Sequence, residues 1–398
     1  MQAKFVISTV AGFLMTASID ASQLNFSGYT AVEGRLFTQS PTLEGQDSDT
    51  PFSYVAEPEI RLQSSDRAHQ LTLIPFLRID SEDKHRTHAD LREAYWRHTF
   101  NSWELLFGVN KMFWGVAESR HLVDIINQTD SIEDIDEEDK LGQPMLLLGL
   151  QRDWGEVQLI FMPYFRERTF PGKNGRLRTP LPVDDDQADY ESSAEEYHVD
   201  IAARYSHYIG DWDIGASYFY GTGREPLLRP HEDGTRLIAF YEIIHQASID
   251  AQYTHEAWLW KFEGIAREGQ GDLFAAAVGG FEFTHYQILD SSMDVGHLLE
   301  YNYDGRDETK APRTVFDNDV FVGSRLVLND VQDTQVLAGA SIDTKTGATF
   351  LSAEAERRLG DGWKIELEGR FFTHIDETDP ASAFERDDFI NVSLQRHF

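Results

Sequence analysis

The sequence predicts an all-β fold: a transmembrane antiparallel up-and-down β-barrel of about 18 strands, with roughly 16–18 compatible with the pattern. From Leu24 onward, apolar and polar residues alternate in segments of about ten to fourteen residues, the length that a tilted strand needs to cross a bilayer. Connectors between the segments alternate between tight turns and long loops. No later stretch reaches the ~18 consecutive apolar residues of a membrane-spanning helix.

The first 21 residues predict a cleaved secretory signal peptide, which leaves 22–398 as a single barrel. Lys4 provides a positive charge, Phe5 to Thr16 form an apolar stretch, and small residues follow up to a cleavage point after Ala21. A buried N-terminal helix is the alternative, but strand-like sequence follows immediately and the segment is too short to span a bilayer.

Eighteen segments carry the alternation in chain order. They are residues 24–37, 52–63, 68–80, 86–98, 102–112, 143–152, 155–165, 196–207, 211–221, 244–255, 257–267, 272–285, 293–304, 316–329, 333–343, 347–359, 362–373 and 386–398. In the third segment Leu71, Leu73, Pro75, Leu77 and Ile79 alternate with residues that include Thr72, Arg78 and Asp80. Strands of soluble sandwiches alternate too, but they are usually near five or six residues long.

The connectors sort by length. Every second one is tight, for example 64–67, 99–101, 153–154 and 360–361, whereas the others include all the long ones, at 38–51, 113–142, 166–195, 222–243, 305–315 and 374–385. Short turns on one side and long loops on the other are typical of a barrel with periplasmic turns, extracellular loops and an even strand count. Closure also removes sheet edges, which lipid cannot hydrogen-bond.

The third connector on the predicted extracellular side, Trp114 to Gln143, has no β-alternation. Leu122, Ile125 and Ile126 have i, i+3, i+4 spacing, which predicts a short amphipathic helix within 118–128 that covers an apolar strip of the inner wall. We therefore expect this loop to fold inward and to constrict a pore. The residues expected to face the solute path are Glu118, Arg120, His121 and Asp124. The acidic second half, Asp130 to Asp139, is expected to lie on the surface.

The polar face of the strands carries charges of both signs. Lumen-lining residues are expected to include Arg61, Arg78, Arg92, Arg204, Lys261, Glu263, Glu300 and Arg370. Opposed acidic and basic rows in a water-filled pore produce a transverse field that selects solutes by charge. The alternative is a plugged interior in which these charges only pair; about eighteen strands favour an aqueous channel, because barrel width grows with strand number.

Aromatic residues collect at the predicted strand ends, and these include Trp96, Trp103, Trp114, Trp154, Trp212, Trp258 and Trp363. Amphipathic rings are stable at headgroup depth, so the pattern indicates two interfacial girdles.

Composition excludes several classes of function. With 68 Asp and Glu against 35 Lys and Arg, and a net charge of −33, the chain lacks the basic face that nucleic-acid binding requires. There is no cysteine, so thiolate metal sites and Cys nucleophiles are absent. No HExxH, GxSxG or phosphate-loop motif is present, so we expect no enzyme, no cofactor and no metal site. Acidic loops at 184–196 and 376–388 are interpreted as solvated surface rather than as sites for divalent cations that bridge lipopolysaccharide.

Several stretches carry a resemblance to known proteins. Trp114-Gly115, Glu118-Ser119, Ile126-Asn127 and Asp130 form a W-G-x-x-E … I-N-x-x-D element, and with 163–168 and 257–263 they make the chain similar to porin-like outer-membrane proteins of Gram-negative bacteria that have no settled substrate. In the last segment Ile390, Val392 and Leu394 alternate outward and the chain ends on Phe398, which resembles the C-terminal signature read by the outer-membrane assembly machinery, although Arg396 departs from it.

The sequence thus predicts a Gram-negative outer-membrane channel for passive diffusion of small hydrophilic solutes, with residues 113–142 as its constriction. The alternative is a barrel component of a lipid or polysaccharide export or assembly system. Expected partners are outer-membrane lipids and lipopolysaccharide, the assembly machinery and the solutes themselves. The identity of the solute and the choice between a monomer and a homo-oligomer stay open.

Overall fold

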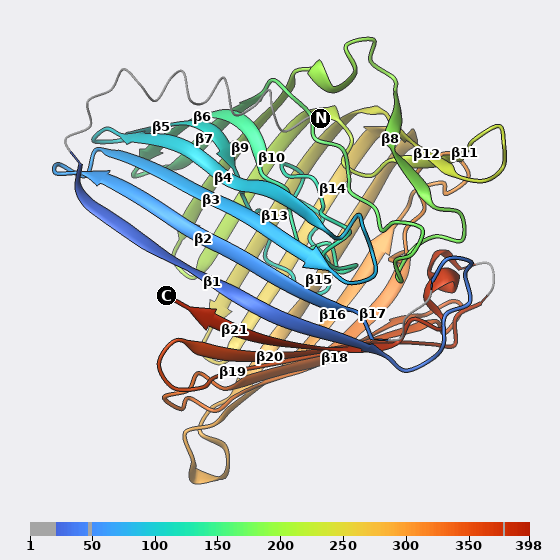
Figure 1. Cartoon of the computed structure of the whole chain (residues 1–398). Helices are drawn as coiled ribbons and strands as arrows, with labels where there is room; N and C mark the ends of the chain where they lie inside the picture. The colour runs from blue at the N-terminus through green and yellow to red at the C-terminus, as the bar shows by residue number, and fades with distance from the viewer. Residues whose placement is uncertain (1–20, 47–49, 377–378) are drawn as a thin grey trace.

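The computed structural model describes residues 21–46, 50–376 and 379–398 (Figure 1). The predicted signal peptide lies almost wholly outside the described residues, so its cleavage stays a prediction. In the described part of the chain no helix is long and apolar enough to cross a membrane. Helical structure there consists of the short 3-10 turns Glu195–Tyr197, Ile288–Asp290 and Pro380–Phe384.

One antiparallel sheet of 18 strands closes on itself, which confirms the predicted fold and strand count. Its strands, in chain order, are β1 (Ala21–Phe37), β2 (Phe52–Ser64), β3 (His69–Asp80), β4 (His88–Thr99), β5 (Trp103–Asn110), β6 (Gln143–Arg152), β7 (Gly155–Met162), β9 (Asp200–Ile209), β10 (Trp212–Thr222), β13 (Ile243–His255), β14 (Trp258–Gly269), β15 (Gly271–His285), β16 (Asp294–Asp304), β17 (Asn318–Val327), β18 (Gln335–Asp343), β19 (Thr349–Arg358), β20 (Trp363–Thr373) and β21 (Phe389–His397). Each strand pairs with the next, and β1 pairs with β21 from Tyr29↔His397 to Phe37↔Phe389. The sheet therefore has no free edge, as a strand-built membrane protein requires.

Short turns and long loops occupy opposite ends of the barrel, as the connector lengths predict (Figure 1). At the loop end, loop 4 (163–199) and loop 5 (223–242) contribute β8 (Val183–Tyr190), β11 (Leu227–Pro230) and β12 (Leu237–Tyr241), which form a small separate sheet. The turn end corresponds to the periplasmic side and the loop end to the extracellular side of such barrels.

The outer surface of the barrel is an apolar belt. Its exposed side chains include Leu24, Phe26, Leu73, Leu77, Ile79, Leu148, Phe161, Ile249, Phe262, Leu299, Val322, Leu367, Val392 and Leu394. These positions alternate along the strands with the inward-facing polar ones, so period-2 alternation separates a lipid face from a lumen face.

The aromatic girdles differ from the expectation. Tryptophans in the belt lie in or near the short turns, at Trp96, Trp103, Trp154, Trp212, Trp258, Trp260 and Trp363, whereas outward tyrosines such as Tyr54, Tyr218, Tyr301 and Tyr303 lie toward the loop end. Trp114 belongs to neither girdle, because it lies in loop 3 (residues 111–142) and is buried inside the barrel. Its assignment to a girdle was wrong.

Arg396 interrupts the apolar row of the last strand without interrupting the barrel. Its guanidinium lies 5.6 Å from the Trp363 ring and donates to the Asp361 carbonyl oxygen at 2.9 Å. The terminal Phe398 stacks on Phe26 with ring centroids 5.2 Å apart, and its N–H donates to the Gly28 carbonyl at 3.1 Å. The chain end thus seals the junction between the first and last strands.

Candidate functional site

Loop 3 (residues 111–142) runs inside the barrel, and one asparagine holds its two ends together. The side chain of Asn127 accepts from the Met112 N–H at 2.9 Å, and its amide nitrogen donates to the carbonyls of Asn110 at 2.9 Å and Leu141 at 2.8 Å. All three bonds are buried or partly buried, so leaving their partners unpaired costs free energy. Asn127 belongs to the W-G-x-x-E … I-N-x-x-D element.

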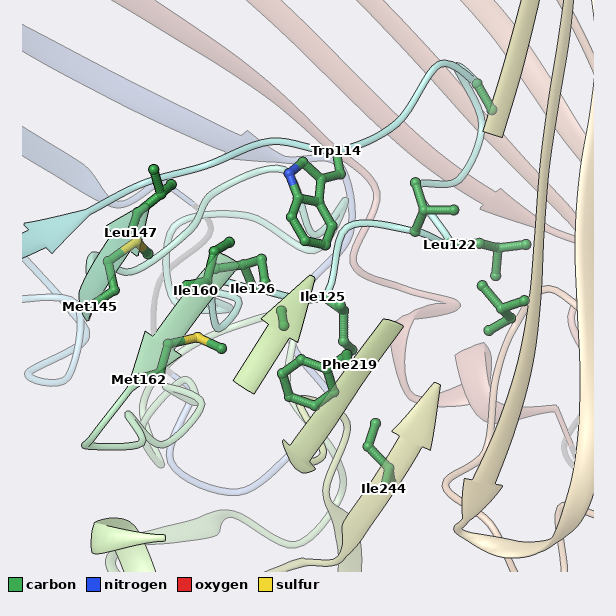
Figure 2. Packing of buried hydrophobic residues seen from close by; sticks show 14 of the residues in the cluster. Trp114, Leu122, Ile125, Ile126, Met145, Leu147, Ile160, Met162, Phe219 and Ile244 are labelled. Carbon is green, nitrogen blue, oxygen red and sulfur yellow. The ribbon is translucent and has the colours of Figure 1, made fainter. Parts of the chain in front are cut away.

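The apolar side of loop 3 packs on the wall that β6, β7, β10 and β13 provide. Leu122, Ile125 and Ile126 are buried there, with Trp114 and Val123. Figure 2 shows Ile125 and Ile126 among wall side chains from several strands, namely Met145, Leu147, Ile160, Met162, Phe219 and Ile244. This sector of the wall is apolar on its inner face as well as its outer face, so the barrel contains a hydrophobic core between loop and wall.

The predicted helix in loop 3 is absent, because wall carboxylates bind the backbone N–H groups that a helix would use. Glu263 accepts from Val116 at 2.6 Å, Ala117 at 2.9 Å and Val123 at 3.2 Å. Glu300 accepts from Glu118 at 2.9 Å and from the N–H and hydroxyl of Ser119 at 2.8 and 2.7 Å. The loop remains irregular, and its backbone is fixed to β14 and β16.

Gly115 makes this approach possible. Its φ is +152°, and a Cβ there would lie 3.0 Å from a Glu263 carboxylate oxygen. A larger residue would push the loop away from the carboxylate that binds it.

The four residues predicted to face the solute path all line one cavity beside loop 3. Glu118 contacts Lys261 at 3.5 Å and Arg325 at 2.8 Å, and Arg120 contacts Asp304 at 2.9 Å.

The other two predicted residues contact groups within loop 3 itself. The His121 ring packs edge-on against Phe113, with centroids 4.8 Å apart. Asp124 accepts from the Trp114 N–H at 3.3 Å and lies 3.6 Å from the Lys140 ammonium. Burial raises the pKa of Asp124 above its ordinary value, and Lys140 opposes that shift. Because Asp124 is buried, its carboxylate holds the loop in place rather than contacting solute.

The acidic half of loop 3 does not lie on the surface, so that expectation was wrong. Asp130 and Glu133 are buried against the β3–β4 wall, where Asp130 pairs with Arg92 at 2.6 Å and Glu133 accepts from the Arg78 Nε at 2.8 Å. Asp130 also accepts from the hydroxyl of Thr169 in loop 4 at 2.6 Å. The basic row of the inner wall neutralises these carboxylates, which explains why an acidic stretch is stable inside the barrel.

Further along the loop, Asp134 and Asp136 contact Arg370 of β20 at 3.3 and 2.8 Å. Glu354 at 2.7 Å and Glu368 at 3.1 Å contact the same guanidinium. Four carboxyl groups thus surround one guanidinium.

The predicted lumen-lining residues all occur on the inner face, in three groups. Arg78, Arg92 and Arg370 bind the acidic half of loop 3, whereas Lys261, Glu263 and Glu300 bind its first half. Arg204 pairs with Asp250 at 2.7 Å and, with Arg61, lines a second cavity at the turn end.

Two water-accessible cavities flank loop 3. The larger, about 830 Å³, follows β18 and β19 from Gln335, the first residue after a short turn, to Ser341 and Phe350 near the loop end. The smaller, about 640 Å³, lies at the turn end beneath the start of loop 3. Lys111 lines both cavities, so it lies where they approach each other.

Loop 4 extends across the extracellular mouth. The Gly172 N–H donates to Asp83 of loop 2 (81–87) at 2.9 Å, and Gln46 of loop 1 (38–51) donates to the Gly175 carbonyl at 2.8 Å. Asp387 of loop 9 (374–388) accepts from the Arg176 Nε at 2.6 Å and from the Leu177 N–H at 2.9 Å. We call residues 170–177 the strap; it joins loops from the far side of the barrel and covers the mouth over β1 to β3 (Figure 1).

One cluster in the lumen has the composition of a cation site, formed by His88, Asp130 and Glu133. Arg92 and Arg78 already pair with its two carboxylates, so a cation would have to displace guanidinium groups. Asp184, Asp185 and Asp186 of β8 form a second such group, in which Asp185 and Asp186 are exposed and Asp184 is partly buried.

Sequence reasoning did not identify several residues that line the lumen. The exposed Glu137, Glu138 and Asp139 form the tip of loop 3 within the larger cavity, and Lys111 lies at its start. The apolar inner wall was a detectable signal, because β6 reads QPMLLLGLQR and is apolar at nearly every position rather than at alternate ones.

Comparisons with known proteins give fold likenesses only. No family model and no curated protein sequence matches the chain. A crystal structure of OccAB1 from Acinetobacter baumannii matches with TM-score 0.53 at 8% identity, covering 96% of this chain and 98% of that one. Wzi, an outer-membrane protein involved in group 1 capsule assembly in Escherichia coli and called a carbohydrate-binding β-barrel, matches with TM-score 0.52 at 11% identity, covering 98% and 87%. A mutant Rh. blastica porin matches with TM-score 0.45 at 11% identity over 94% and 100%.

The closed barrel and its apolar belt are the architecture of proteins of the Gram-negative outer membrane.

Proposed function

We propose that this barrel is a porin-like channel through which small hydrophilic solutes diffuse passively, with loop 3 as its constriction. The larger cavity supports the proposal most directly. It extends along β18 and β19 from a periplasmic turn toward the extracellular end, and charged and polar side chains line it. Loop 3 packs against the opposite wall through its apolar core and the carboxylates of Glu263 and Glu300, so it narrows the lumen without filling it.

The experiment is single-channel recording of the purified mature chain in planar bilayers. We expect discrete conductance steps, and we expect larger steps from a variant in which Arg168 and Glu137, which pair at 2.9 Å across the upper end of the cavity, are both replaced by Ala. Folded barrels that show no ion-permeable state, in either form, would refute the channel.

A second function is supported by the strap. A mouth covered by loop 4 suits a barrel that binds or positions a polymer at the cell surface, and the Wzi likeness is to a protein described as a carbohydrate-binding barrel. A capsular polysaccharide that binds to the intact barrel, together with absent conductance, would favour this assembly role over the channel.

A further inference from the structure

Most cationic side chains that line the larger cavity are buried and have little contact with the water in it. Nine of them have side chains that are 15% exposed or less, and each contacts a carboxylate. They are Arg78, Arg86, Arg92, Arg120, Lys140, Arg168, Arg224, Arg267 and Arg370. A buried guanidinium paired with a carboxylate presents little net charge to a passing solute.

The carboxylates of the same cavity are more exposed. Glu137 and Glu138 at the tip of loop 3 have side chains that are 51% and 65% exposed, and Glu354 on β19 is 48% exposed. Glu356 and Glu366 follow at 28% and 35%, and both contact the single ammonium of Lys364. Water in the cavity therefore contacts carboxylates far more than cations.

Three cationic residues are exceptions to this pattern. Arg325 is 31% exposed, but it pairs with Glu118 at 2.8 Å. Arg35 is half-buried and donates to the Glu133 carbonyl at 3.3 Å. Lys111 is exposed at the junction of the two cavities and is the cation that most directly faces the path.

From this asymmetry we infer that the channel selects cations, and that its solutes are small cations, inorganic or organic. The inference rests on the proposed function. Glu137, Glu138 and Asp139 at the loop tip, with Glu354 on the wall, determine the specificity. Lys111 limits it.

A pathway lined by one sign of charge within low-dielectric walls concentrates counter-ions. Two parts of the cavity lining here carry the same sign of accessible charge: the loop tip, and the inner face of β19 and β20. Salt screens such a field over about 8 Å at physiological ionic strength and about 3 Å at 1 M. Selectivity should therefore be clear in dilute salt and weak in concentrated salt.

The test is the reversal potential across a KCl gradient, measured with the full barrel in planar bilayers. We expect potassium to permeate at least about twice as readily as chloride near 0.1 M salt, and this ratio to approach one near 1 M. The triple variant Glu137→Gln, Glu138→Gln, Asp139→Asn should lower the ratio. Lys111→Gln should raise it.

The matched control is Asp185→Asn, Asp186→Asn, Asp189→Asn, which removes the same charge from exposed positions of β8 outside the cavity. It should leave the ratio unchanged. Conductance that does not prefer potassium, or a ratio that the loop-tip and β8 variants lower equally, overturns the cation inference and leaves the channel standing. Folded barrels without any conductance overturn the channel and the inference together.

Discussion

At the scale of single residues, loop 3 is held by groups that belong to the W-G-x-x-E … I-N-x-x-D element. Trp114 fills the core between loop and wall, Asn127 joins the loop ends, and Asp130 binds Arg92. Glu118 pairs with Lys261 of β14 and Arg325 of β17. The element therefore describes how an inserted loop is anchored.

Asp139 gives the channel a testable pH response. Enclosure within the lumen and then the Glu133 carboxylate raise the pKa of Asp139 to about 7, against the opposing charge of Arg92. Asp130, Asp134 and Tyr29 of β1 also face it. Asp139 is thus charged above pH 7 and becomes neutral as the pH falls through 7. We expect the potassium preference to decrease from pH 8 to pH 6, as measured by reversal potential.

His121 is the group that could imitate this response. Burial lowers its pKa, but Glu138 and Glu263 outweigh burial and hold the pKa of His121 above its ordinary value. Its protonation also weakens cation preference, so two variants separate the causes. Asp139→Asn should flatten most of the pH dependence, whereas His121→Gln should leave most of it. The reverse result would assign the response to the histidine.

At the scale of elements, the alternation of apolar and polar residues was enough to predict all eighteen barrel strands and the sorting of their connectors. It worked because water or lipid on either side of a sheet imposes period 2 on each strand. It could not predict the conformation of loop 3. The spacing of Leu122, Ile125 and Ile126 suits a helix, but their loop instead donates its N–H groups to carboxylates of strands more than 100 residues away.

The burial of the acidic half of loop 3 could not be predicted from the sequence, for the same reason. A run of carboxylates is normally solvated, and only the closed barrel brings Arg78, Arg92 and Arg370 to within contact of it. Long-range charge pairing leaves no local pattern in a sequence, so neither the buried acids nor the exposed loop tip could be distinguished from surface.

The strap in loop 4 provides a prediction at this scale. Asp387 is buried and binds both the Arg176 guanidinium and the Leu177 N–H, and Leu177 itself has a left-handed φ of +58°. Breaking a buried charge pair typically costs about 3–5 kcal/mol. We expect Asp387→Asn to release the strap, seen as faster proteolysis within 170–177 and as larger or noisier conductance steps.

The control for the strap is Glu385→Gln, which makes the same charge change at an exposed position of loop 9, immediately after the 3-10 turn Pro380–Phe384. It should behave like the unmodified barrel. Equal proteolysis of all three proteins would mean that the ion pair does not hold the strap closed.

At the scale of the whole molecule, the inner wall of the barrel consists of two different sectors. One sector of its inner wall, from β5 to β16, packs on the first half of loop 3 through a hydrophobic core and two carboxylate anchors. The rest of the wall, from β17 through β21 to β4, binds the acidic half of loop 3 through Arg78, Arg92 and Arg370 and borders the larger cavity. A uniform polar lumen would have left the apolar side of loop 3 without a wall to pack on. The position of the larger cavity is therefore set by which strands are apolar on both faces.

This division predicts the result of removing the loop core. Replacing 116–126 with a short Gly-Ser linker should leave the barrel closed, because no ladder between neighbouring strands includes these residues. It should lower thermal stability, since each fully buried aliphatic side chain contributes about 1.5–3 kcal/mol and Leu122, Val123, Ile125 and Ile126 are all lost. Conductance should rise several-fold, because the linker no longer narrows the lumen. The control is a comparable replacement of 231–235, an exposed tip of loop 5, which should change neither thermal stability nor conductance. If the loop 3 replacement leaves the conductance unchanged, the constriction lies elsewhere, and the strap is the next structure to test.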